Sequence, residues 1–205
     1  MYYILSNELE KPKFDLHIAG ALVDSKGNIE PNIFGYGESV KNIADSKYSV
    51  KADDTFSMPG KLRDRLSVYI HNSIYLFIVS KKVQTLLTQF ATNQVEFYPF
   101  QFDYGETIFS DYKIVNVLNK VDCLNLEESD IDFEDYNEDY DVGVGSIYTI
   151  DKLVLNTSLI PPNLNIFLLG RSIDPIIIFH ESLKKQIEAL NLSGFVFCLP
   201  ENFQM

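Results

Sequence analysis

Residues 175–200 read PIIIFHESLKKQIEALNLSGFVFCLP. The stretch opens with Pro175 and the β-branched, apolar run 176–179, which is typical of a strand that is buried on both faces. Apolar side chains then recur at helical spacing, at Leu183, Ile187 and Leu190. Asn191 favours the end of this helix, and residues 195–197 resume an apolar, extended pattern. The stretch therefore predicts a strand, a helix and a second strand.

A similar pattern lies about one hundred positions earlier, where residues 75–99 read YLFIVSKKVQTLLTQFATNQVEFYP. Alignment of the two stretches pairs their apolar helix positions, Val83 with Leu183, Leu87 with Ile187, and Phe90 with Leu190. We interpret the stretches as two copies of one β-α-β unit that pack into a common core. We therefore expect all of these helix side chains to be buried.

The rest of the chain predicts mainly strands. Strand patterns cover residues 2–6, 112–126, 147–155 and 164–169, and a hairpin pattern covers residues 18–29. Residues 61–70 predict a helix because their apolar side chains follow helical spacing, at Leu62, Leu66, Tyr69 and Ile70. Residues 28–60 are rich in turn-forming residues and predict irregular surface structure.

These elements predict an α+β fold, with a mixed β-sheet, two similar β-α-β units and few helices. We expect one domain over residues 1–205, with 1–102 and 103–205 as candidate subdomains, since no linker rich in Ser, Gly or Pro divides the chain. The longest apolar run, residues 74–79, is far shorter than the roughly 20 residues of a membrane span. No signal-peptide pattern opens the sequence, and Cys123 and Cys198 lie in apolar contexts that favour buried thiols, so we expect a cytoplasmic protein.

Negative charge is concentrated in one segment of the chain. The net charge is −12, and residues 103–151 hold fourteen acidic residues against Lys113 and Lys120, whereas acids and bases balance elsewhere. We do not expect such a chain to bind nucleic acid or an anionic membrane, because contacts to phosphate need Lys and Arg. The charge predicts a partner with a basic surface.

The densest part of this segment is residues 127–141, which carry nine carboxylates in fifteen residues, EESDIDFEDYNEDYD. An EF-hand calcium loop does not fit, because the required glycine is missing. The run is either a solvated face or a docking surface, and the aromatic residues among the acids favour docking. The candidate partner-binding residues are Glu127, Glu128, Asp130, Asp132, Phe133, Glu134, Asp135, Tyr136, Glu138, Asp139, Tyr140 and Asp141.

The sequence carries none of the common motifs of a nucleophile, phosphate-binding or zinc-protease site. His17, His71 and His180 are widely spaced, and none accompanies a ligand or nucleophile motif. His180 stands where the second predicted helix begins, so we expect it to cap that helix. We therefore expect no enzymatic activity, no cofactor and no metal.

Three segments carry a resemblance to a known family. They are the opening MYYILS, residues 112–129 with Asn116 and Asp122, and residues 164–197 with Pro175 before an apolar strand and an amphipathic helix. These segments resemble a bacterial immunity-protein family of polymorphic toxin systems, typified by a myxobacterial member and formerly described as a domain of unknown function. Two departures are His180, where a serine is expected, and residues 28–60, where little matches.

The resemblance implies a cytoplasmic antidote that binds a cognate toxin domain and blocks it. The resemblance implies no catalytic residues in this chain. The acidic segment agrees with this function, because many such toxins are nucleases with basic clefts that carboxylates can occupy. Two alternatives stay open, namely a carboxylate- or metal-dependent enzyme and a regulatory adaptor without a toxin.

Overall fold

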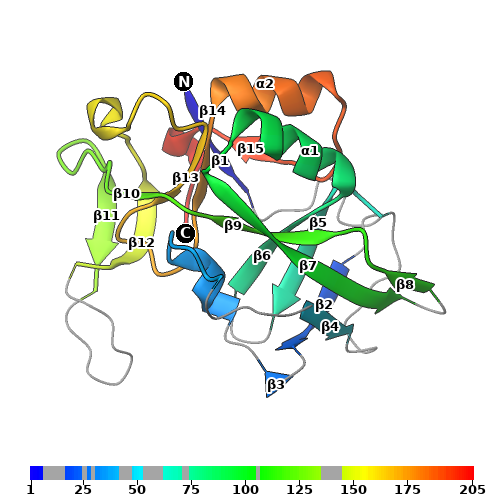
Figure 1. Cartoon of the computed structure of the whole chain (residues 1–205). Helices are drawn as coiled ribbons and strands as arrows, with labels where there is room; N and C mark the ends of the chain where they lie inside the picture. Colours follow the sequence, from blue (N-terminus) through cyan, green and yellow to red (C-terminus); the bar gives the residue numbers. More distant parts are fainter. Residues whose placement is uncertain are drawn as a thin grey trace.

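The computed structural model describes residues 1–6, 17–24, 27–28, 31–41, 48–52, 62–70, 74–104, 107–134 and 145–205. Within these ranges the protein consists of a β-barrel, a mixed sheet, a separate hairpin and the α-helices α1 (Lys81–Phe90) and α2 (Glu181–Ala189) (Figure 1). The predicted α+β class with mixed sheets and few helices is confirmed.

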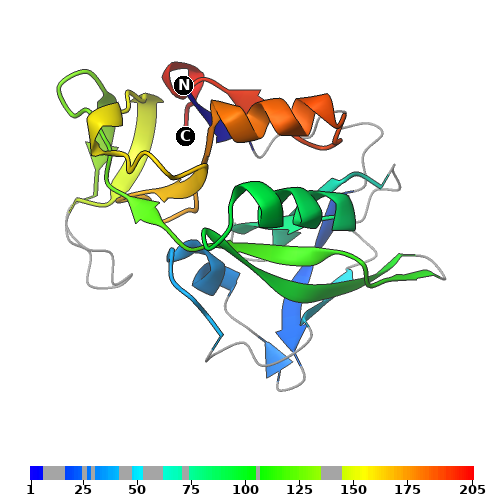
Figure 2. The same cartoon turned by 45° about the horizontal axis from the view of Figure 1, so that its top comes forward.

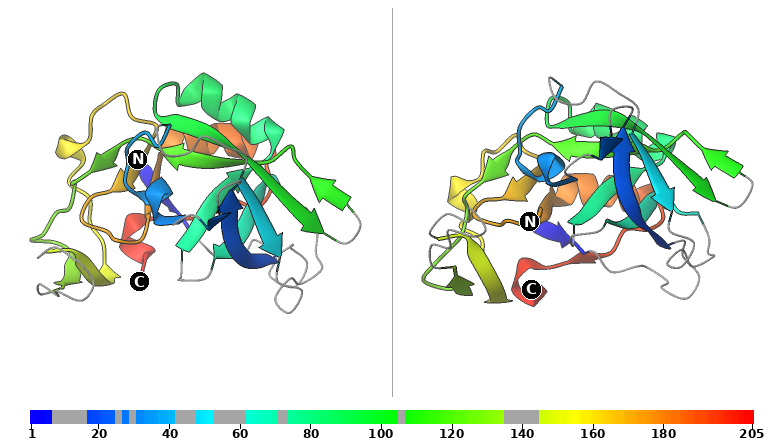
Figure 3. Two further views of the ribbon diagram at one scale, coloured as in Figure 1. Left: turned by 60° about the horizontal axis from the view of Figure 1, so that its bottom comes forward. Right: turned by 90° about the horizontal axis from the view of Figure 1, so that it is seen from below.

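Six strands pair in a ring. In the order of pairing they are β2 (His17–Asp24), β4 (Tyr48–Ala52), β7 (Val95–Tyr104), β9 (Lys113–Val117), β6 (Ile74–Val79) and β5 (Arg65–Ile70). Pairing of β5 with β2 closes the barrel, and β3 (Gly27–Asn28) and β8 (Thr107–Phe109) extend single strands of it (Figure 3). Its interior is filled by large apolar side chains, including Phe100, Phe102 and Ile114. Closure removes the open edges that a sheet of this size would otherwise expose.

A second, five-stranded sheet lies beside the barrel. Its strands pair in the order β10 (Lys120–Val121), β13 (Ile166–Leu169), β14 (Ile177–His180), β1 (Tyr2–Leu5) and β15 (Phe197–Cys198). Successive side chains of β14 enter different cores, since Phe179 faces the helices and Ile178 faces the opposite core. The strand predicted after Pro175 is thus buried on both faces.

Both aligned stretches form the predicted strand–helix–strand units. Helix α1 connects β6 to β7, and α2 connects β14 to β15. In each unit the two strands are parallel and flank one antiparallel strand, which is β9 in the first unit and β1 in the second. Figure 2 shows the two helices side by side, with α1 over the barrel and α2 over the five-stranded sheet.

The helices and both sheets share one core. Val83, Leu87, Leu183 and Ile187 are at most 2% exposed in it, and Phe90 packs against it half-buried. The expectation that Leu190 is buried is wrong, because this side chain is 57% exposed. Helix α2 ends at Ala189, and the chain turns at Asn191 with a φ of 48°, so that Leu192 packs against the core instead.

Two further expectations are corrected. Residues 61–70 do not form a helix, because residues 65–70 are strand β5, which pairs along its whole length with β6. Residues 28–60 are not simply irregular, since they include strand β4 and the 3-10 helix η1 (Pro31–Gly35). Phe34 of η1 and Val40 pack into the barrel core.

The remaining predicted strands are confirmed, except that the strand predicted over residues 112–126 is two short strands in different sheets. Residues 112–126 contain β9, which belongs to the barrel, and β10, which belongs to the five-stranded sheet. The hairpin of β2 and β3 and strands β1, β12 (Ile147–Lys152) and β13 fall where they were predicted. Short 3-10 helices follow at η2 (Thr157–Leu159) and η3 (Pro200–Asn202). None of the helices in the described ranges has the length and hydropathy needed to cross a membrane.

Candidate partner-binding surface

The acidic run begins in a hairpin that stands apart from the barrel, at one end of the molecule (Figures 1 and 3). Strand β11 (Asp130–Phe133) pairs antiparallel with β12. Its side chains alternate, so that Asp130 and Asp132 are exposed while Ile131 and Phe133 pack against a core formed by the five-stranded sheet and the hairpin. We call β11, β12 and the preceding Glu127 and Glu128 the acidic hairpin.

The side chain of Arg171 contacts both the inner face of the acidic hairpin and the body of the protein. The guanidinium of Arg171 lies 6.0 Å from the ring centroid of Phe133, and its Nε donates to Asp122 Oδ2 at 2.7 Å. Asp122 is therefore engaged within the protein. Phe133, predicted as a partner-binding residue, faces the core in this arrangement.

Strand β12 has neighbours on both of its edges. On the edge opposite β11, the N–H of Ile150 donates to the carbonyl of Met205 at 2.9 Å, and the N–H of Met205 donates back at 3.0 Å. Ile147 forms a parallel bridge with Ser172 on the same edge. Within the described residues, β11 is thus the open edge of this two-stranded sheet. Charged side chains on an edge strand oppose indiscriminate pairing with other strands.

The structure brings together the first part of the predicted binding residues. Glu127, Glu128, Asp130 and Asp132 are all exposed, and Asp132 Oδ2 accepts a hydrogen bond from Thr149 Oγ1 at 3.1 Å. Glu134 is half-buried, and its Oε2 has no hydrogen-bond partner among the described residues. The other predicted residues, Asp135, Tyr136, Glu138, Asp139, Tyr140 and Asp141, lie outside the described residues.

Two exposed apolar residues next to these acids were not predicted. Tyr148 is 63% exposed and Ile173 is 53% exposed. Ile147 and Ser172 form a parallel bridge, and Tyr148 directly follows Ile147 while Ile173 directly follows Ser172. Sequence periodicity gives no signal for this pair, because a bridge between distant segments brings the two residues to one part of the surface.

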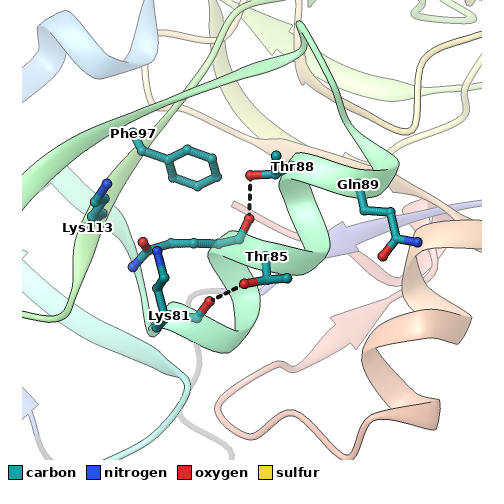
Figure 4. A pocket seen from close by; sticks show the side chains of 7 residues that line it. Lys81, Thr85, Thr88, Gln89, Phe97 and Lys113 are labelled. Carbon is teal, nitrogen blue, oxygen red and sulfur yellow. Dashed lines mark hydrogen bonds between the residues drawn. The ribbon is translucent and has the colours of Figure 1, made fainter.

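A polar groove of about 450 Å³ lies elsewhere, between α1 and strands β7 and β9 (Figure 4). It is lined by Lys81, Gln84, Thr85, Thr88, Gln89, Phe97 and Lys113. The hydroxyls of Thr85 and Thr88 donate to helix carbonyls at 3.0 and 2.8 Å, and Gln84 Nε2 donates to two further carbonyls. These donors are used within the protein, so the groove presents two lysines, Gln89 and Phe97 rather than a set of convergent polar groups.

Two described groups of the kinds that catalysis often uses, the thiol of Cys123 and the imidazole of His180, have structural surroundings. Burial, followed by the charge of Asp122, raises the pKa of the Cys123 thiol to about 12, so this thiol stays protonated at neutral pH. His180 Nδ1 accepts from the N–H of Ser182 at 3.3 Å, which confirms the predicted helix cap. No group of three His, Cys, Asp or Glu in the described part of the chain is placed to hold a metal ion.

Comparison with known proteins supplies the remaining observation. No curated protein matched the chain. The model of the immunity protein family Imm11 matches residues 14–199, which include the barrel, both helices and the acidic hairpin. The match covers most of the 205 residues, so the resemblance found in the sequence is confirmed. The chain belongs to the Imm11 family of immunity proteins.

Proposed function

We propose that this protein neutralises a cognate toxin domain by binding it, and that the acidic hairpin is part of the surface that binds. Membership of an immunity family supports the toxin as partner. The single observation that carries the binding surface is the exposure of Glu127, Glu128, Asp130 and Asp132 on one projecting element.

Charge complementarity defines the partner. The exposed carboxylates belong to the segment that holds the whole charge excess of the chain, −12. A toxin domain with a basic surface would be attracted to this segment before contact, and charges of the wrong sign would be rejected. A nuclease is one toxin of this kind, because its substrate cleft is basic and carboxylates can stand where phosphates bind.

The residues of the acidic hairpin have different roles in this proposal. The four exposed carboxylates meet the toxin, whereas Phe133 holds β11 against the core and shapes the surface from behind. Asp135, Tyr136, Glu138, Asp139, Tyr140 and Asp141 continue the same acidic run and extend the proposed binding surface. We place the complex in the cytoplasm, where an antidote meets an incoming toxin.

Inhibition by binding differs from catalysis in its stoichiometry. The surroundings of Cys123 and His180 favour an inhibitor, because burial keeps the thiol protonated and the imidazole caps a helix. An inhibitor titrates the toxin in proportion to its amount, while an enzyme that modifies the toxin acts at a small fraction of that amount.

The test uses the toxin domain that we expect to be encoded beside the gene of this protein. We expect the purified full-length protein to form a stable complex with that domain and to abolish its activity at about equimolar amounts. Growth of cells that produce the toxin should be restored by co-production of this protein. A toxin domain from an unrelated system is the control, and it should be neither bound nor inhibited. Lack of binding and of protection against the cognate domain would refute the proposal.

A further inference from the structure

The exposed pair Tyr148 and Ile173 is produced by the irregular geometry of β12. Ile147 and Ile150 are both buried, at 2% and 1% exposure, although they are three positions apart. Both side chains belong to the same core, and a regular strand cannot place both there, because positions three apart lie on opposite faces. The pairing of β11 with β12 shifts register twice, and Tyr148 and Asp151 are the residues left over by these shifts. Such bulges redirect a side chain, and here they leave Tyr148 exposed.

The bridge to Ser172 places Ile173 beside this bulge. Ile147 pairs with Ser172 in a parallel bridge, and the N–H of Ile147 donates to the carbonyl of Arg171 at 2.9 Å. Ser172 is buried, and its hydroxyl donates to the carbonyl of Asp174 at 2.6 Å, so the segment around Ile173 is fixed. The two exposed side chains therefore sit on hydrogen-bonded backbone rather than on a loose loop.

Carboxylates neighbour this apolar pair along the chain and across the hairpin. Asp132 on β11 pairs with Thr149, the residue after Tyr148, and accepts a hydrogen bond from its hydroxyl. Asp151 on the same strand and Asp174 beside Ile173 are also exposed. Interfaces commonly have this form, with a tyrosine anchor at the centre and a charged rim around it.

We propose that Tyr148 and Ile173 form the apolar anchor of the binding surface, and that they receive an apolar side chain which the toxin domain presents between Lys and Arg residues. The proposal rests on the proposed function and deepens it. The carboxylates would steer the toxin toward the surface, and the anchor would slow its release. The charge of the rim argues for this occupant, because a second copy of the chain would bring like charges together.

The test is the kinetics of the complex between the full-length protein and the cognate toxin domain. For the double variant Tyr148→Ala/Ile173→Ala we expect the dissociation rate to rise about tenfold or more, while the association rate changes little. The control is Ile108→Ala/Leu190→Ala, which removes residues that are 61% and 57% exposed. These lie on β8 and at the C-terminal end of α2, away from the acidic hairpin in Figures 1 and 2, so both rates should stay unchanged.

The outcomes separate the two proposals. Since the mutated side chains are exposed, both variants should keep the thermal stability of the unaltered protein, and a circular dichroism melt checks this. A second variant, Tyr148→Phe, keeps the ring and should keep the slow dissociation. If the unaltered protein binds and protects but Tyr148→Ala/Ile173→Ala dissociates at the same rate, the anchor is refuted and the proposed function stands. If the unaltered protein does not bind the toxin, both are refuted.

Discussion

The core that the two helices share with both sheets differs from the acidic hairpin in the side chains that its elements expose to solvent. In the core, α1 and α2 bury Val83, Leu87, Leu183 and Ile187 against strands of both sheets. In the hairpin, the alternation along β11 turns Asp130 and Asp132 to solvent. The first region contributes free energy of folding through apolar burial, whereas the exposed carboxylates of the second contribute little to it. This difference indicates that substitutions in the core should change stability, and substitutions of the exposed carboxylates of the hairpin should change binding.

The largest effect is expected in the core. Leu87→Ala and Ile187→Ala should each lower the free energy of unfolding by about 2–5 kcal/mol, because each removes buried methyl groups and leaves a cavity. Denaturant titration followed by circular dichroism measures this. Leu190→Ala is the matched control, since Leu190 is 57% exposed, and its effect should stay within about 0.5 kcal/mol.

The same variants test whether the chain folds as one domain. We propose that residues 1–205 unfold as a unit, because one core joins the barrel to the five-stranded sheet. Leu87→Ala, in the first β-α-β unit, and Ile187→Ala, in the second, should then shift one common transition. Two separate transitions, each sensitive to only one variant, would contradict this and would favour two subdomains.

A buried carboxylate sharpens the comparison with the exposed ones. Glu96 is 9% exposed, and it accepts hydrogen bonds from Tyr98 OH at 2.6 Å and Ser39 Oγ at 2.8 Å and pairs with Lys41 at 2.9 Å. Burial would raise its pKa, but the hydrogen bonds and the charge of Lys41 outweigh burial and lower the pKa. The ionised form is therefore favoured by folding, and it holds residues 39–41 onto the barrel.

Glu96→Gln should lower the free energy of unfolding at pH 7 by about 1–3 kcal/mol, because hydrogen bonds to a charged acceptor are weakened. A lowered pKa contributes stability that is present above the ordinary Glu value of about 4.3 and is lost as the pH falls through the folded-state value. The difference in free energy of unfolding between Glu96→Gln and the unaltered protein should thus be constant above about pH 5.5 and shrink in more acidic solution. Urea titrations at several pH values measure it, and a difference independent of pH would contradict the assignment.

A smaller effect is expected at the start of α2. His180 caps this helix through Nδ1, and its pKa is lowered mainly because burial disfavours the imidazolium. His180→Ala should cost about 0.5–2 kcal/mol. A histidine with a lowered pKa contributes stability that is present above its ordinary value of about 6.5 and is lost as the pH falls below it.

His180→Asn is the control for this titration, because asparagine keeps an acceptor for the N–H of Ser182 but does not titrate. The unaltered protein should therefore lose stability relative to His180→Asn as the pH is lowered from about 8 to 5. Parallel pH dependences for the two proteins, measured by thermal unfolding, would contradict the lowered pKa of His180.

Local patterns predicted the two β-α-β units well but failed where distant pairing decides the structure. The apolar run at residues 176–179 and the helical spacing after it leave few alternatives. In residues 61–70 the apolar side chains fit a helix, yet Leu66, Val68 and Ile70 also alternate as in a strand. Pairing with β6 on one side and β2 on the other selects the strand. Neither this pairing nor the closure of the barrel has a local signal.

The candidate binding surface shows the same limit. Composition alone located the carboxylates of the acidic hairpin, because charge density needs no knowledge of the fold. It did not show that Phe133 faces the core, nor that Tyr148 is exposed by a bulge beside Ile173. These features depend on the register of β12 against β11 and on its bridge to a segment about 25 residues away.

The smallest effect on stability and the most direct test of function come from the same variant. Glu127→Gln/Glu128→Gln/Asp130→Asn removes three exposed charges from the acidic hairpin and should leave the free energy of unfolding nearly unchanged. Its matched control is Glu38→Gln/Asp111→Asn/Glu188→Gln, which removes three exposed charges from other parts of the molecule. Both variants carry the same net charge, so only the position of the charge differs.

The deciding measurement is the rate of association with the cognate toxin domain at low and at physiological salt. Our account predicts that the hairpin variant associates severalfold more slowly at low salt and with a weaker dependence on salt, because steering by the carboxylates is lost. The control variant should keep most of the rate and of the salt dependence. Equal rates and equal salt dependence for the two variants and the unaltered protein would contradict the account and place the binding surface elsewhere.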